Sequence, residues 1–363
     1  MNNCGLPFEY EYPYLVGPYA KEHKIPVALT LELTPFCNFS CVMCYVRLSE
    51  KQARVYGSMM TAEQILDIAE QAKECGTIYL CLTGGEPLSR PDFWDIYKEL
   101  NKMGFVISLL SNGSLIDEKA IEKFREYGMP SSVKISLYGA SNETYKKVCG
   151  VDGGFTATAR AIELLKKEKV PLALSATIVR ENADDIIEMY RFAAEHKVPF
   201  SHTVSVVKSV RGCKNSAEAS RFMFGEFAEN LTLEQLEKHK FRNPESPFSW
   251  CANYGRTAWI TWNGHMQLCA FMNGPYSVLD DGFKNAWREI IDKLDALKNP
   301  EVNTVNFVSV VPACFVQKAE MHRRFPLRYV TRQKGCMRHI IKKLRRREDE
   351  KRIYSSKVSV LFC

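Results

Sequence analysis

Short apolar runs alternate with amphipathic stretches between residue 27 and about residue 207. The runs are rich in leucine or β-branched residues, as is typical of strands, whereas the stretches between them repeat apolar residues at helical spacing. The predicted strands cover residues 27–33, 77–83, 106–111, 133–138, 172–179 and 201–207. The predicted helices cover residues 61–74, 91–103, 117–127, 155–168 and 183–196, the first with Thr61 as its candidate N-cap.

Six strands that alternate with helices through short connections imply parallel pairing by right-handed crossovers. An α/β barrel, open or closed, and a doubly wound sheet are the folds compatible with this order. Six units are fewer than the eight of a complete (β/α)8 barrel. In α/β barrels, functional groups gather on the loops at the carboxyl ends of the strands. The loop after the first strand is therefore the first place to look for chemistry.

That loop, "TPFCNFSCVMCYVR", carries Cys37, Cys41 and Cys44 at the spacing C-x3-C-x2-C. A structural zinc site takes four ligands, and no fourth cysteine or histidine lies nearby in the sequence. A 4Fe-4S cluster that only transfers electrons has four thiolate ligands. Three thiolates would leave one iron open to bind a substrate or a cofactor.

This spacing after a first strand resembles the signature loop of the radical S-adenosylmethionine (radical SAM) superfamily. The resemblance implies that the three cysteines bind a 4Fe-4S cluster, whose open iron is chelated by the amino and carboxylate groups of S-adenosylmethionine (SAM). The residue before the third cysteine is usually aromatic and lies near the adenine. Here that residue is Met43, an apolar and polarizable substitute.

A second motif, "TGGEP", directly follows the second predicted strand and contains Gly84, Gly85, Glu86 and Pro87. It resembles the GGEP motif that holds the methionyl amino group in radical SAM enzymes. Glycines allow the backbone to approach a ligand closely, and the Glu86 carboxylate would face an ammonium. A GGEP tetrapeptide by itself is usually an ordinary loop, but its position one βα unit after the cysteine loop favours the cofactor site.

Weaker polar candidates follow at the next two strand ends. Ser111 and Asn112 begin "SNG" after the third strand, and Ser136 begins "SLYG" at the end of the fourth. In related enzymes polar groups at these places contact the carboxylate or ribose of SAM. A plain turn is the alternative interpretation at each place.

A second unit is expected to begin near Trp250, after the linker-like "RNPESPFSW". Two strand-like runs, "TAWITW" and "HMQLC", are joined by Asn-Gly, the dipeptide preferred in type I′ hairpins. The hairpin would carry Cys269 back towards Cys251. This segment resembles the opening half of a SPASM domain, which binds auxiliary 4Fe-4S clusters. Only Cys314 and Cys336 follow where that domain has five cysteines, so the resemblance leaves room for one auxiliary cluster or none.

The resemblance therefore implies an α/β fold, namely a partial (β/α)6 TIM-like barrel with a small C-terminal auxiliary iron-sulfur (SPASM-like) domain. The expected divisions are an N-terminal extension, the radical SAM barrel, a degenerate SPASM-like domain and a basic tail. Their residues are 1–26, 27–230, 250–340 and 341–363.

Composition narrows the function further. The 363 residues are 46% hydrophobic and 25% charged, an ordinary globular composition. Thirteen cysteines without an export signal or a membrane-spanning run favour a reduced, cytoplasmic protein over a disulfide framework. The net charge of +7 is concentrated between residues 318 and 352, where fourteen Lys or Arg face four acidic residues. We interpret this run as a solvated helix, since it contains "EDE" and has no interleaved aromatic residues, so neither nucleic acid nor a membrane is an expected partner.

The function implied by the resemblance is reductive cleavage of SAM to a 5′-deoxyadenosyl radical, which abstracts hydrogen from a peptide or protein substrate. An electron donor such as flavodoxin or ferredoxin would be a partner, and no general base can be assigned. The alternatives are a radical SAM enzyme that acts on a small molecule, a non-catalytic iron-sulfur protein, and a zinc or nucleic-acid protein that uses the basic tail.

Overall fold

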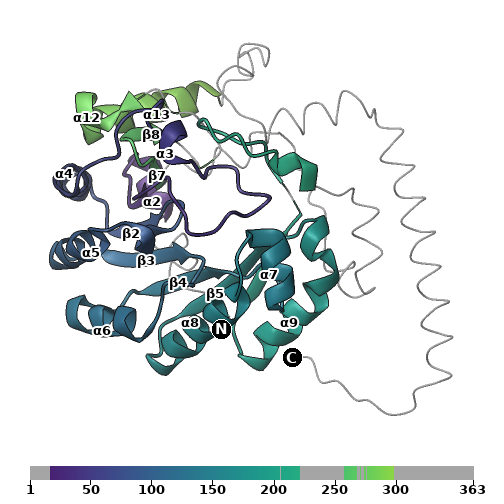
Figure 1. Cartoon of the computed structure of the whole chain (residues 1–363). Coiled ribbons are helices and arrows are strands. Elements are labelled where there is room, and N and C mark those ends of the chain that lie inside the picture. Colours follow the sequence, from purple (N-terminus) through teal and green to yellow (C-terminus); the bar gives the residue numbers. More distant parts are fainter. Residues whose placement is uncertain are drawn as a thin grey trace, which may run out of the picture.

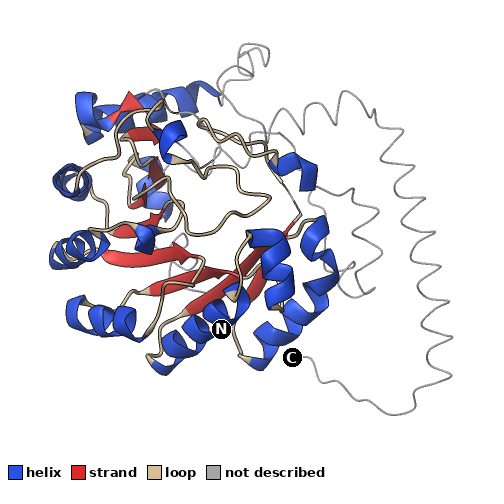
Figure 2. Cartoon of the chain, viewed as in Figure 1, coloured by secondary structure: helices blue, strands red, loops and turns tan. Residues whose placement is uncertain are grey.

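The structure is a computed structural model that describes residues 17–204, 206–220, 257–267, 270, 274 and 276–297. Its centre is a sheet in which six parallel strands lie side by side in chain order (Figure 2). These strands are β1 (Ala28–Glu32), β2 (Tyr79–Thr83), β3 (Val106–Ser111), β4 (Ser132–Ser136), β5 (Leu172–Thr177) and β6 (Phe200–Thr203). All six predicted strands are thus confirmed. The sheet order never reverses, which excludes the doubly wound alternative.

Helices connect the parallel strands and cover one face of the sheet (Figure 1). The five predicted helices correspond to α4 (Ala62–Glu74), α5 (Phe93–Lys102), α6 (Glu118–Tyr127), α8 (Gly154–Lys167) and α9 (Ile186–Glu195). Thr61 caps α4 as predicted: its hydroxyl accepts from the Gln64 N–H at 3.2 Å, and the Gln64 side chain accepts from the Thr61 N–H. This arrangement is the expected partial (β/α)6 barrel.

The sequence analysis missed several short elements. Helix α7 (Asn142–Cys149) lies between β4 and α8, and the Ser141 hydroxyl caps its first turn. The other elements outside the six units before β7 are α2 (Gly17–Glu22), α3 (Glu50–Ala53), and the 3-10 turns Pro87–Ser89, Arg180–Asp185 and Ala217–Ser220. None of the described helices is long and apolar enough to cross a membrane.

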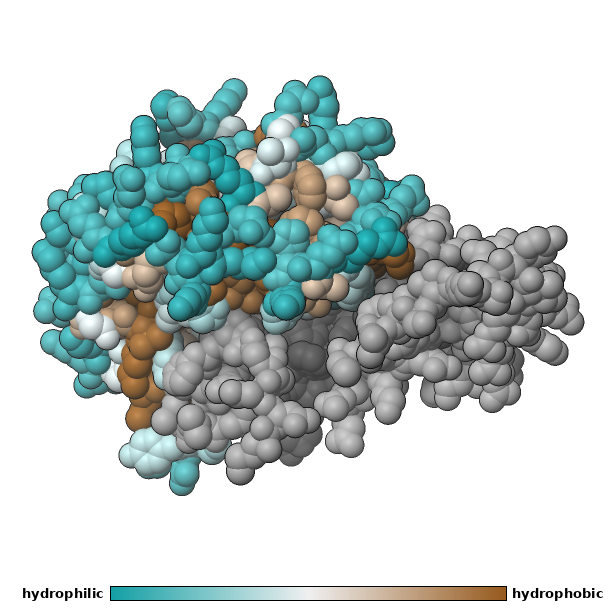
Figure 3. Space-filling model, turned by 90° about the horizontal axis from the view of Figure 1, so that it is seen from below, coloured by the Kyte–Doolittle hydropathy of each residue, from teal (hydrophilic) through white to brown (hydrophobic). Residues whose placement is uncertain are grey.

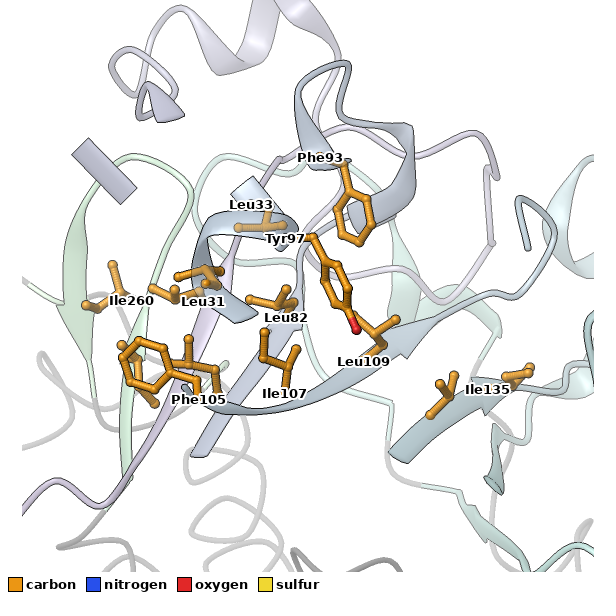
Figure 4. Close-up of a cluster of buried hydrophobic side chains, with 14 of the residues drawn as sticks. Leu31, Leu33, Leu82, Phe93, Tyr97, Phe105, Ile107, Leu109, Ile135 and Ile260 are labelled. Atoms are coloured by element: carbon orange, nitrogen blue, oxygen red, sulfur yellow. The ribbon is translucent and has the colours of Figure 1, made fainter. Parts of the chain in front are cut away.

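The main core lies between the sheet and its helices. In the close-up Leu82 and Leu109 lie beside Tyr97 of α5, and Leu31 lies between Leu82 and Ile260 (Figure 4). All three leucines are fully buried. Burial of each such side chain stabilises the fold by about 1.5–3 kcal/mol. Hydrophilic residues cover most of the described surface seen from below, with apolar residues in narrow strips between them (Figure 3).

The predicted C-terminal hairpin is present, and it continues the same sheet. Strand β7 (Thr257–Ile260) pairs in parallel with β1, and β8 (His265–Gln267) and β9 (Tyr276–Ser277) add antiparallel strands beyond it. The turn is not type I′, because Asn263 is not among the described residues with positive φ. Instead, residues 262–264 form a three-residue loop that ends at Gly264, whose φ is +78°. The Gly264 N–H donates a hydrogen bond to the Thr261 carbonyl.

Two helices follow the hairpin, α12 (Val278–Asp281) and α13 (Phe283–Leu297). Helix α13 contacts α4, where the Phe283 N–H donates to the Gln71 side chain at 2.9 Å. The Trp287 indole donates to the Lys24 carbonyl at 2.6 Å. These contacts hold the hairpin's end of the sheet against the barrel.

Candidate cofactor site

The cysteine loop after β1 and the "TGGEP" loop after β2 pack directly against each other. The Gly85 N–H donates to the Thr34 carbonyl at 2.7 Å, and the Glu86 N–H donates to the Phe36 carbonyl at 2.9 Å. A Cβ at Gly84 would lie 2.5 Å from the Thr34 oxygen, and one at Gly85 only 2.0 Å from the Phe36 oxygen. The two glycines are therefore required by the neighbouring backbone, whereas the sequence suggested that a ligand required them.

Glu86 is fully buried at the junction of these loops. Its carboxylate accepts from the Ser111 hydroxyl at 2.9 Å, the Asn112 N–H at 2.8 Å and the Leu88 N–H at 3.3 Å. Burial raises the pKa of Glu86 to about 7, although these hydrogen bonds act in the opposite direction. Among the described residues no Lys, Arg or His forms an ion pair with it. A buried carboxylate without a cationic partner in the described chain is suited to an ammonium ligand.

The thiols of the cysteine loop are surrounded by hydrogen-bond donors. The Phe39 N–H donates to Cys37 Sγ at 3.3 Å, and the Arg47 N–H donates to Cys44 Sγ at the same distance. The Asn112 amide lies 3.8 Å from Cys37 Sγ, so the third strand end reaches the cysteine loop. Donors of this kind stabilise the thiolate form that binds metal.

In the protein without metal these thiols keep their protons at neutral pH. Burial raises the pKa of Cys37 to about 12 and that of Cys44 to about 11. A hydrogen bond with the Cys149 thiol, together with burial, raises the pKa of Cys41 well above its usual range. Metal binding must displace these protons.

Two segments distant in sequence hold the cysteine loop in place. At the end of α7 the carbonyls of Val148 and Cys149 accept from the N–H groups of Val42 and Ser40, both at 2.8 Å. After β6 the side-chain amide of Asn215 lies 2.9–3.1 Å from the carbonyl oxygens of Cys41, Val42 and Cys44. The sequence analysis did not identify Asn215, since a lone asparagine in an irregular stretch has no recognisable spacing.

Among the described residues no three His, Cys, Asp or Glu side chains converge on one metal ion. A single-ion site and a 4Fe-4S cluster make different demands, because each thiolate of a cluster binds its own iron. Cys37, Cys41 and Cys44 offer one thiol each to three irons of such a cluster.

Residues 31–193 match the Radical SAM superfamily. This stretch of the chain therefore forms a radical SAM domain. It is 29% identical over 187 residues to the AdoMet-dependent heme synthase of Methanosarcina barkeri (strain Fusaro / DSM 804), covering 52% of each chain. It is 28% identical over 183 residues to the PqqA peptide cyclase of Gluconobacter oxydans (strain 621H), covering 49% of each chain. The chain thus spans about half the length of these curated relatives.

The fold is also similar to that of Streptococcus suis SuiB in the crystal structure with bound precursor peptide SuiA. The TM-score is 0.53 with 16% sequence identity, and the similarity covers 83% of this chain and 71% of SuiB. At this identity the likeness shows the fold alone.

A 4Fe-4S cluster and SAM are the cofactors of the radical SAM domain. The donor set around the two loops fits them. Cys37, Cys41 and Cys44 offer three thiols, and Glu86 offers a carboxylate whose pKa lies near neutrality. Pro87 is buried and starts the 3-10 turn that follows Glu86.

The remaining predicted residues of the radical SAM domain lie at the same end of the sheet. Ser111 and Asn112 both bind the Glu86 carboxylate, so they reach the cofactor site through it. Met43 is buried in a cluster beside the cysteine loop with Phe39 and Tyr145, and its position near an adenine stays a prediction. Ser136 ends β4, and its carbonyl accepts from the Tyr145 hydroxyl at 3.3 Å.

The predicted auxiliary-cluster cysteines Cys251, Cys269, Cys314 and Cys336 lie outside the described residues, as does the basic tail, residues 341–363. Within the described part the hairpin brings β8 back beside β7, as the sequence predicted. The auxiliary cluster therefore stays a prediction.

Proposed function

We propose that this radical SAM enzyme abstracts a hydrogen atom from a peptide or protein substrate. The catalytic part of the proposal is supported by one observation. The three-thiol loop packs against a loop whose buried carboxylate, Glu86, has no cationic partner among the described residues. The peptide part is supported by the sequence similarity to PqqA peptide cyclase.

Cys37, Cys41 and Cys44 would hold the cluster, and Glu86 would hold the amino group of SAM. When bound, these cofactors supply one-electron cleavage of the sulfonium bond and a hydrogen-abstracting 5′-deoxyadenosyl group. The protein's residues orient these cofactors and shield them from water. The Glu86 carboxylate is itself fixed by Ser111 and Asn112, so the ammonium it binds has a defined position. Asn215 and helix α7 keep the cysteine loop in place over the strand ends.

A small-molecule substrate is the second candidate, because the AdoMet-dependent heme synthase is as similar in sequence as the peptide cyclase. Both proposals share the same cofactor site and differ only in what occupies the interior of the barrel. We expect a low-potential donor such as flavodoxin or ferredoxin to reduce the cluster in the cell.

The test is anaerobic reconstitution with iron and sulfide, followed by measurement of 5′-deoxyadenosine formed from SAM under dithionite. We expect one product signal in the wild type and none in Cys41→Ala, which should also contain less iron. A mixed-sequence peptide library and an iron porphyrin are then compared for stimulation of 5′-deoxyadenosine formation. Stimulation only by the porphyrin would reject the peptide proposal, and iron loading without any 5′-deoxyadenosine would reject both.

A further inference from the structure

A closed ring of side-chain hydrogen bonds joins the loop after β3 to the cysteine loop. Asn112 and Ser114 belong to the first loop and Asn38 to the second. The Asn112 amide nitrogen donates to the Asn38 side-chain oxygen at 2.9 Å, and the Asn38 nitrogen donates to the Ser114 hydroxyl at 2.8 Å. That hydroxyl donates to the Asn112 side-chain oxygen at 2.6 Å. The ring therefore ties the position of the Asn112 side chain to the cysteine loop.

The orientation of the Asn112 amide is fixed by a main-chain donor. The Ser114 N–H, which can only donate, bonds one terminal atom of the Asn112 side chain at 2.9 Å. That atom must therefore be the oxygen, and the other terminal atom must be the nitrogen. Asn112 is only 7% exposed, so water competes little for these groups.

Every hydrogen-bonding position of the Asn112 side chain has a partner in the described chain. The two lone pairs of its oxygen accept from the N–H and the hydroxyl of Ser114. One proton of its nitrogen goes to Asn38, and the other faces Cys37 Sγ at 3.8 Å. The sequence suggested a contact between this loop and SAM, but a SAM oxygen would have to displace one of these partners.

Cys37 Sγ thus has a side-chain donor besides its main-chain donor, the Phe39 N–H at 3.3 Å. A protonated Cys37 thiol can itself donate to the Asn38 oxygen, which lies 3.9 Å from Sγ. A metal-bound thiolate has no proton and can only accept. Phe39 would supply its N–H with almost any side chain, whereas the Asn112 donor depends on the amide group.

A hydrogen bond to a ligating sulfur affects the electron affinity of an iron-sulfur cluster. Such bonds are one of the factors that set the reduction potential. Reduction adds negative charge to the cluster and its thiolates, and an N–H donor is stronger towards the more negative acceptor. A donor to Cys37 therefore favours the reduced form and raises the potential.

The side chain of Asn112 can be changed without removing its bond to Glu86. That bond comes from the main-chain N–H of Asn112, which donates to the Glu86 carboxylate at 2.8 Å. Any residue other than proline retains this N–H. Substitutions at this position therefore separate an effect on the cysteine loop from an effect on the proposed ammonium site.

We propose that the Asn112 side chain donates a hydrogen bond to the cluster-bound Cys37 thiolate and thereby raises the reduction potential of the cluster. This inference rests on the proposed function, since it assumes that Cys37 binds the cluster. Asn112 is a positioning residue in this proposal, because it acts through Cys37. Asn38 and Ser114 keep its nitrogen turned towards the sulfur.

The test is a redox titration of the reconstituted full chain without SAM, followed by EPR. Asn112→Leu is similar in shape to asparagine but removes both amide protons. We expect it to lower the equilibrium constant for one-electron reduction about tenfold, which is a midpoint potential about 59 mV lower. Asn112→Asp places a carboxylate oxygen near the sulfur and should lower the potential further. Asn285→Leu and Asn285→Asp, at an exposed position of α13, should leave it unchanged.

A measurement on the unsubstituted protein covers the case in which the Asn112 variants bind no cluster. Wild-type protein is labelled with ¹⁵N only in the side-chain amide of asparagine, and its reduced cluster is studied by pulsed EPR. We expect a weak ¹⁵N coupling from the amide that faces Cys37. A reduced cluster without this coupling would overturn the inference.

Two further results would also overturn it. The first is the same midpoint potential in Asn112→Leu and the wild type when both carry a full cluster. The second is an unchanged potential together with about tenfold weaker SAM binding in Asn112→Leu by equilibrium dialysis, which would assign the amide to SAM.

The titration requires neither substrate nor turnover, so the two proposals fail separately. Wild-type protein that forms 5′-deoxyadenosine, with a potential that does not depend on Asn112, would overturn only the role of Asn112. A potential that depends on Asn112 in protein that forms no 5′-deoxyadenosine would support this role and reject the proposed reaction. Wild-type protein that binds no iron would overturn both.

Discussion

The contact between the "TGGEP" loop and the cysteine loop can be tested with one added methyl group. In Gly85→Ala the new Cβ would lie 2.0 Å from the Phe36 oxygen and 2.4 Å from its carbonyl carbon. These are backbone atoms, so the two loops must separate. Separation breaks the Gly85–Thr34 and Glu86–Phe36 hydrogen bonds, at about 0.5–1.5 kcal/mol each. Overpacking adds about 1–3 kcal/mol, so we expect a total loss of about 2–6 kcal/mol in the free energy of unfolding.

Gly104→Ala is the matched control. Gly104 has φ +82°, but no atom lies within 4 Å of a Cβ added there. Only the left-handed backbone conformation opposes the alanine, at about 1–2 kcal/mol. The comparison therefore separates a steric clash at the site from ordinary backbone strain.

Anaerobic urea unfolding of the cluster-free proteins, followed by tryptophan fluorescence, measures the difference. Iron content after reconstitution gives an independent second measurement, because the added Cβ would also lie 3.0 Å from the Cys37 nitrogen. We expect Gly85→Ala to lose both stability and iron, and Gly104→Ala to keep its iron. Equal unfolding midpoints and equal iron contents in the two variants would refute the packing of these loops.

Three further predictions concern single side chains. Cys41→Ala should lower the iron content after reconstitution and abolish 5′-deoxyadenosine formation. Cys75→Ala, at the far end of α4, should keep the wild-type iron content by iron assay and the product by chromatography. The affinity for SAM should rise as the pH increases from 6 to 8, because the pKa of Glu86 is about 7 and only the Glu86 anion attracts an ammonium. Equilibrium dialysis of the reconstituted protein measures this affinity. A similar rise in Glu86→Gln would contradict the role of Glu86. Arg211→Met should lower the free energy of unfolding by about 3–5 kcal/mol, since it leaves the Glu32 carboxylate buried without its cation. The double variant Arg211→Met/Glu32→Leu should regain most of that free energy. Urea unfolding measures both changes.

The fold could be predicted to a large extent from local patterns. Each parallel strand and each of the five main helices has its own apolar periodicity, and Thr61 caps α4 through residues only three positions away. Helix α7 was missed because its eight residues directly follow a polar turn and precede another helix, so no separate apolar period marks it. The hairpin was predicted, but its turn type was wrong: the three-residue loop depends on how Thr261 pairs with His265 across the strands.

The candidate site was predictable only where its residues are close in sequence. The C-x3-C-x2-C spacing places three thiols on one loop whatever the rest of the chain does. By contrast, Asn215 holds that loop from a distance of more than 170 residues. Such a contact leaves no periodic signal, because it depends on which strand ends meet.

The sequence by itself determined the alternating elements, the three-thiol loop and the carboxylate that follows the second strand, because each depends on residues within a few positions of one another. The tertiary structure alone decided that Gly84 and Gly85 face the backbone of the cysteine loop, that β7 lies beside β1, and that Glu32 at the end of β1 forms a buried ion pair with Arg211. These relations follow from strand order and register, which are set by the joint burial of side chains from the whole sheet and cannot be assigned to any one segment.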